Sequence, residues 1–129
     1  MAERYMRYVT EVTGGASAAQ VYEAPNDGAA GAADSVIIGF LICSRSSSAG
    51  TVTVEIQDYA TNGTGLTQKT IGIADTIPLP ADTSIDLIPG KLVLQHAGNN
   101  EATPVLTGDR VNVTSTQECD ITVSVVERV

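Results

Sequence analysis

The chain has 129 residues, enough for one globular domain that buries roughly two thirds of its unfolded surface. Asp and Glu number 15 against 7 Lys and Arg, and the formal net charge of −8 disfavours binding to the phosphate backbone of DNA or RNA. Tryptophan is absent and aromatic residues make up only 4%, so platforms for stacking on bases or sugars are scarce. We therefore predict one domain over residues 1–129 with a core of Val, Ile, Leu and Ala.

The first segment, residues 1–12, alternates charged and apolar residues and is predicted to be an N-terminal arm or an edge strand. It has no obvious core to join, so exchange with a neighbouring copy is one option. Tyr5 and Tyr8 in this segment are candidates for contacts between subunits. The following segment ASAAQVYEA, residues 16–24, fits two helical turns and a strand equally well.

The segment SVIIGFLICS, residues 35–44, is apolar at both odd and even positions. We predict a strand covered on both faces, by the opposite sheet on one side and by another element or a subunit on the other. Gly39 within it indicates a bulge or a close approach of backbone. Four of its side chains complete the candidate subunit contacts: Val36, Ile38, Phe40 and Ile42.

Three later segments alternate apolar and polar residues with a period of two, which is typical of strands with one wet face. They are TVTVEIQ (residues 51–57), RVNVTS (residues 110–115) and CDITVSVVE (residues 119–127). The linker SSSAG, residues 46–50, predicts a hairpin between the covered strand and TVTVEIQ. The last two segments are likewise predicted to pair as a final hairpin.

Proline marks the middle of the chain. IPLPADTS, residues 77–84, holds two prolines and is predicted to run extended from one sheet to the other. SIDLIPGKLVLQ, residues 84–95, reads as two short strands around a corner at Pro89 and Gly90. With eight or nine short strands, the chain is predicted to be all-β, as a two-sheet antiparallel β-sandwich or a jelly roll.

No group of residues predicts a catalytic, cofactor-binding or metal site, and we expect a protein that is not an enzyme. His96 is the only histidine and is predicted to be a surface residue. Cys43 and Cys119 lie too far apart for the clustered ligands of a structural zinc site. Both are predicted to be small buried hydrophobes, with a disulfide within the chain or between copies as the alternative.

The order of the segments resembles small β-rich virion structural proteins of tailed bacteriophages, including capsid decoration (cement) proteins. The segments that carry the resemblance are AAQVYEAP (residues 18–25), SVIIGFLICSRSSSAGTVTVEI (residues 35–56), IPLPADTSIDLIPGKLVLQ (residues 77–95) and GDRVNVTSTQECDITVSVVE (residues 108–127). The resemblance implies a virion protein that packs symmetrically as a dimer or trimer and contacts the major capsid protein or other virion proteins. It carries over no catalytic residues.

Three functions stay open from the sequence. The first is a capsid decoration protein that stabilises the major capsid lattice by protein–protein contacts. The second is a neck, collar or tail component of the same virion. The third is a carbohydrate- or receptor-binding module, for which Tyr22 or Tyr59 must supply an exposed aromatic ring.

The expected location is the virion, after synthesis in the host cytoplasm. The opening MAERYMRYVTEV lacks the apolar core of a secretory signal, and the longest apolar run, residues 36–43, is too short to cross a bilayer. We therefore expect no membrane partner.

Overall fold

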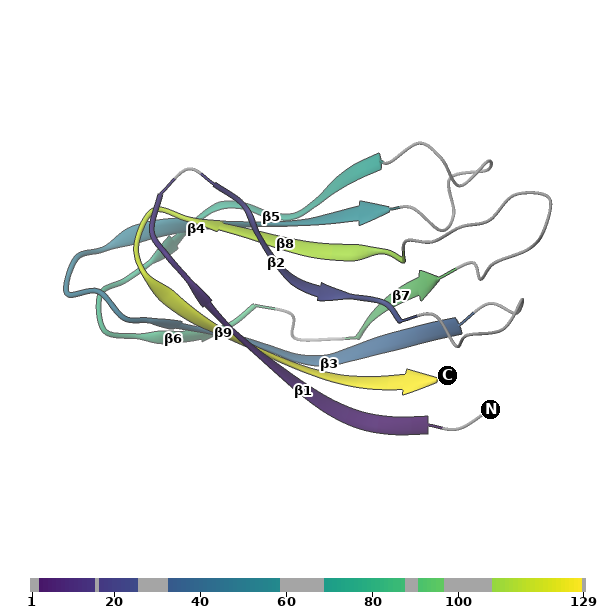
Figure 1. Ribbon diagram of the computed structural model, residues 1–129. Coiled ribbons are helices and arrows are strands. Elements are labelled where there is room, and N and C mark those ends of the chain that lie inside the picture. Colours follow the sequence, from purple (N-terminus) through teal and green to yellow (C-terminus); the bar gives the residue numbers. More distant parts are fainter. Residues whose placement is uncertain are drawn as a thin grey trace.

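Two antiparallel sheets are stacked in the computed structural model of this chain (Figure 1). The structure describes residues 3–15, 17–25, 33–58, 69–87, 91–96 and 108–128. One sheet has five strands, with β1 (Glu3–Val12), β9 (Cys119–Arg128), β3 (Ala33–Ser44) and β6 (Ser84–Asp86) in order and β7 (Leu92–His96) also paired with β3. The other has four, in the order β2 (Ala19–Glu23), β8 (Arg110–Ser115), β4 (Gly50–Asp58) and β5 (Lys69–Leu79). The predicted all-β, two-sheet sandwich is confirmed.

The core lies between the sheets and consists of the inward half of each alternating strand. In β9 every second residue from Cys119 to Val125 is buried, and β4 and β8 show the same pattern. The three segments predicted from their alternation are therefore confirmed as strands, with bounds that differ by no more than one residue. Branched Val and Ile side chains suit this packing because they fill the space above a pleated surface.

The doubly apolar strand β3 divides its side chains between two environments. Ile37, Phe40 and Ile42 are buried against the opposite sheet, whereas Ile38 and Leu41 are 46% and 43% exposed. The register with β9 shifts between Ile37 and the glycine at position 39, so the predicted bulge is confirmed. A Cβ on that glycine would meet the neighbouring strand only at ordinary contact distance, so close backbone approach is not its role. No described element covers the outer face of β3.

Two predicted hairpins are wrong. The linker at residues 46–50 joins β3 to β4, and residues 116–118 join β8 to β9, so each connects strands of different sheets. Both crossings lie at the same end of the sandwich, where the Thr116 N–H donates to the Thr51 carbonyl (3.0 Å) and the Arg45 N–H donates to the Glu118 carbonyl (2.9 Å). Alternation predicts a strand but says nothing of its partner, which is why the sequence pattern failed here.

A third predicted connection is confirmed, and a fourth lies outside the described residues. Residues 77–84 pass from β5 to β6 and hence from the four-stranded to the five-stranded sheet, as predicted. The two short strands β6 and β7 pair with β3 at separate places, and the corner predicted between them, at Pro89 and Gly90, lies outside the described residues. Residues 19–23 form a strand, which settles the helix–strand ambiguity. Among the described residues there is no helix with the length and hydropathy needed to cross a membrane.

Candidate interaction surface

The outer face of the five-stranded sheet carries a group of apolar side chains, interrupted by Arg7 and Ser124, which we call the apolar face. Strand register places Tyr5 opposite Val126, Val126 opposite Val36, and Val36 opposite Val93, so one apolar row crosses four strands. Further along the strands, three more apolar side chains extend this row. The apolar face consists of Tyr5, Val9, Val36, Ile38, Leu41, Val93 and Val126.

These side chains are accessible in the single chain. Tyr5 is 76% exposed, Val9 63% and Val93 54%. Of the eight large apolar side chains that are exposed among the described residues, five belong to the apolar face. Apolar side chains scattered singly over a surface are ordinary, whereas a cluster aligned by register is a candidate contact site.

Charged side chains lie at both ends of the apolar face. At one end Arg128 donates from Nη1 to Asp34 Oδ2 at 3.3 Å. At the other end Arg45 and Asp120 form an ion pair of 3.0 Å. An apolar centre with a charged rim is the usual anatomy of a protein–protein interface.

The outer face of the four-stranded sheet is polar, and we call it the polar face. Its outward residues on β4 and β8 are Thr51, Thr53, Glu55, Gln57, Arg110, Asn112 and Thr114. Arg110 also pairs with Glu23 on the edge strand β2, with 2.7 Å between Nε and Oε1. Such a face gains little from leaving water, so it is the weaker candidate for a docking surface.

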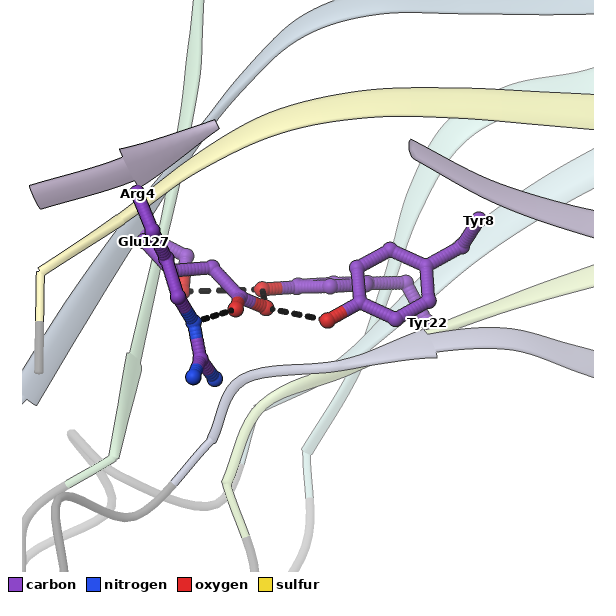
Figure 2. Close-up of polar contacts among 5 residues, drawn as sticks. Arg4, Tyr8, Tyr22 and Glu127 are labelled. Carbon is purple, nitrogen blue, oxygen red and sulfur yellow. Dashed lines mark hydrogen bonds and ion pairs between the residues drawn. The ribbon is translucent and has the colours of Figure 1, made fainter. Parts of the chain in front are cut away.

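A buried carboxylate fixes the edge of the sheet that carries the apolar face (Figure 2). Glu127 continues the inward alternation of β9 and is 1% exposed. Arg4 donates from Nε to its Oε1 at 2.8 Å, while the hydroxyls of Tyr8 and Tyr22 donate to its Oε2 at 2.9 and 2.6 Å. Because the single proton of Tyr22 goes to the carboxylate, the Ser35 hydroxyl, 2.9 Å away, donates to Tyr22.

This Glu127 cluster links four strands and both sheets, with Glu127 on β9 and Ser35 on β3. Arg4 and Tyr8 come from β1, whereas Tyr22 comes from β2 in the opposite sheet. The rings of Tyr8 and Tyr22 also pack together, with centroids 5.2 Å apart. The cluster therefore holds β1 in place, and with it Tyr5 of the apolar face.

The Glu127 cluster also keeps its tyrosines neutral. Burial, followed by the hydrogen bond to the carboxylate, raises the pKa of Tyr22 far above its ordinary value of 10.0. The same two causes raise the pKa of Tyr8. A carboxylate taken out of water is costly unless it is paired and hydrogen-bonded, and these three donors meet that requirement. This cluster is not among the predicted sites, although Glu127 shares the inward parity of Ile121, Val123 and Val125 in CDITVSVVE, which was a signal that it is buried.

The structure separates the six predicted contact residues. Tyr5, Val36 and Ile38 lie together on the apolar face, and Tyr8 lies in the Glu127 cluster. Phe40 and Ile42 are 1% and 0% exposed in the core, where they face the opposite sheet. The bulge in β3 turns these two side chains toward the opposite sheet, so they contribute to the core of the single chain.

Other candidate residues take ordinary places. Cys43 and Cys119 are free thiols; Cys119 is buried, which raises its pKa, and Cys43 is half-buried on the outside of β3. Tyr22 is 5% exposed and so offers no ring to a sugar, and Tyr59 lies outside the described residues. His96 is the last residue of β7, and its predicted surface position stays a prediction because its side chain lies outside the described part of the structure. No group of three His, Cys, Asp or Glu among the described residues could hold a metal ion.

A scan against protein-family models and a search of curated proteins find no match. A search of solved structures finds chains from viral particles. The chain matches 33% of a chain from the Gx strain of infectious bursal disease virus over 99% of its own length, with 15% identity and a TM-score of 0.54. It matches 31% of a chain from T=1 particles derived from infectious bursal virus over 98% of its length, with 17% identity and a TM-score of 0.56.

The chain thus spans about a third of the length of these viral proteins. At such low identities the likeness shows a shared β-sandwich fold and nothing more. Since the matches are to infectious bursal disease virus, the resemblance to proteins of tailed bacteriophages stays a prediction.

Proposed function

We propose that this chain is a structural protein of a virus particle, namely a capsid decoration protein of a tailed bacteriophage that binds the outside of the shell through its apolar face. It acts by contact and not by catalysis. The observation that carries the proposal is the row of outward apolar side chains from Tyr5 to Val93, aligned across four strands, of which Tyr5 and Val93 are exposed and Val36 and Val126 half-buried. The fold shared with viral capsid proteins supports a virion location.

The size of the apolar face suits a repeated contact. Four strands about 4.8 Å apart, over about six residues of 3.4 Å each, give a footprint on the order of 400 Å². A single contact of that size is modest compared with a standard interface of about 800 Å² per partner. On a symmetric shell, many equivalent copies or linked copies make such a contact effective through multivalency.

A neck, collar or tail role is the second candidate, because the same apolar face could equally pack into a ring. The two roles differ in copy number. For the decoration role, quantitative mass spectrometry of purified virions is expected to give a copy number near that of the major capsid protein. A ratio of a few per cent assigns the chain to the neck or tail, and absence from the particle contradicts both roles.

The apolar face can be tested directly with a matched pair of variants. We expect Leu41→Asp to abolish binding to particles that lack the protein, because it replaces an exposed apolar side chain of the apolar face by a carboxylate. Thr53→Asp makes the same kind of change on the polar face and is expected to bind as the unaltered chain does. Equal binding by both variants would show that the apolar face is not the contact.

A further inference from the structure

The edges of the two sheets are protected against pairing in unequal ways. β5 carries two register shifts and Pro78, and β2 is five residues long with a shift of its own. β6 and β7 have three and five residues. Short strands, bulges and prolines are the devices that keep sheet edges from joining another chain.

β1 has none of these three devices; its only protection is charge, from Glu3, Arg4, Arg7 and Glu11, which opposes any pairing that sets like charges together. It is ten residues long, pairs with β9 without a register shift, and contains no Gly or Pro. No described strand pairs with its other edge. A long, regular edge of this kind presents backbone donors and acceptors to any strand that can lie beside it.

The outward side chains of β1 carry charges in an order that complements itself. Glu3, Arg7 and Glu11 are all exposed and lie four residues apart. Among the described residues neither Arg7 nor Glu11 has an ion-pair partner, and Glu11 stands opposite Asp120, a like charge. Asp120 is already paired with Arg45, so a cation placed beside Glu11 would give Glu11 a partner of its own.

The charge order selects one register for pairing with a second copy. A two-fold axis perpendicular to the sheet keeps outward residues outward, so odd positions of one β1 face odd positions of the other. Centring the pair on Arg7 sets Arg7 against Arg7 and Glu3 against Glu11, which is repulsive. Centring it on Tyr5 sets Arg7 opposite Glu3, but that register overlaps only residues 3–7 of β1, and Glu3 already lies opposite Arg128 on β9. Centring it on Val9 sets Arg7 of each copy opposite Glu11 of the other and overlaps residues 6–12, so charge order and overlap together favour this register.

We infer that β1 is a dimerisation edge that pairs antiparallel with β1 of a second copy about a two-fold axis at Val9. The pairing joins two five-stranded sheets into one, forms two Arg7–Glu11 contacts, and brings together two Val9 side chains that are 63% exposed in the single chain. Both apolar faces then lie on the same side of the joined sheet. The inference concerns the isolated protein and does not rest on the proposed function.

Cysteine cross-linking tests the register. In the dimer the two Val9 Cα atoms are about 4.5–5.5 Å apart, within the range of a disulfide. Val9→Cys, in a Cys43→Ser background, is expected to give a disulfide-linked dimer on mild oxidation, mapped to position 9 by mass spectrometry. Tyr5→Cys is the matched control, since its two copies are about 27 Å apart at 3.4 Å per residue and should stay unlinked.

Charge exchange tests the same contacts without a covalent bond. Arg7→Glu alone and Glu11→Arg alone are each expected to raise the dimer dissociation constant about tenfold, because each creates two like-charge pairs by symmetry. The double variant R7E/E11R restores opposite charges and is expected to dimerise like the unaltered chain. Sedimentation velocity over a concentration series measures all four proteins.

Three outcomes would overturn the inference. They are a monomer at every concentration, cross-linking at position 5 but not at position 9, and a double variant weaker than either single variant. The last two leave dimerisation intact but reject this register.

Discussion

The apolar face and the polar face are built on the same pattern and differ only in the outward half of it. On both sheets alternate residues fill the core, as Val123 does in β9 and Val54 in β4. The outward residues of β4 and β8 are all polar, whereas those of the five-stranded sheet combine Tyr, Val, Ile and Leu with polar residues such as Arg7 and Thr122. Folding needs only the inward half, so the outward apolar residues of the five-stranded sheet are not required by the core.

The largest expected change in the free energy of unfolding comes from the buried side of β3, and the exposed side of the same strand is its control. Phe40→Ala is expected to lower the free energy of unfolding by about 3–5 kcal/mol, because it removes a fully buried ring. Leu41→Ala, at the next position but on the apolar face, is expected to cost less than about 1 kcal/mol. Urea unfolding measures both. A similar loss for Leu41→Ala would place the apolar face within the core of the fold and remove its availability to a partner.

The next largest effect is expected from Glu127, whose loss should loosen β1 of the apolar face and leave the polar face unchanged. Glu127→Ala is expected to cost about 2–4 kcal/mol, since it leaves Tyr8 and Tyr22 without their acceptor and opens a cavity. Amide hydrogen exchange should speed up first in β1, with β4 and β8 still protected. Glu55→Ala on the polar face is the control, expected within about 0.5 kcal/mol of the unaltered chain. Uniform loss of protection would refute a local role for the Glu127 cluster.

The smallest effect probes the Glu127 cluster by pH. The folded chain raises the pKa of Tyr22 above the unfolded value of 10.0, so its protonated form stabilises the fold fully below pH 10 and this contribution falls as pH rises further. The expected slope is at most about 1.4 kcal/mol per pH unit for Tyr22, with a smaller share from the partly exposed Tyr8. Tyr22→Phe should flatten the loss measured by urea unfolding between pH 9 and about 11. Tyr5→Phe, on the exposed side of β1, should leave it unchanged.

Local pattern by itself determined much of this protein. Alternation with a period of two predicted strands at residues 51–57, 110–115 and 119–127, because the side chains of a strand alternate between its faces whatever its neighbours are. Gly39 signalled the bulge, and the two prolines of residues 77–84 signalled the crossing between sheets. Composition and strand spacing were sufficient for the sandwich.

Pairing between distant strands was decided only by the tertiary structure. The linkers at residues 46–50 and 116–118 look like hairpin turns, yet they cross between layers, because the partner of a strand depends on residues far along the chain. The same holds for the inward burial of Glu127, which needs donors from β1 and β2. The division of β3 into Phe40 inside and Ile38 outside depends on its register against β9, and the apolar face exists only once that register aligns four strands.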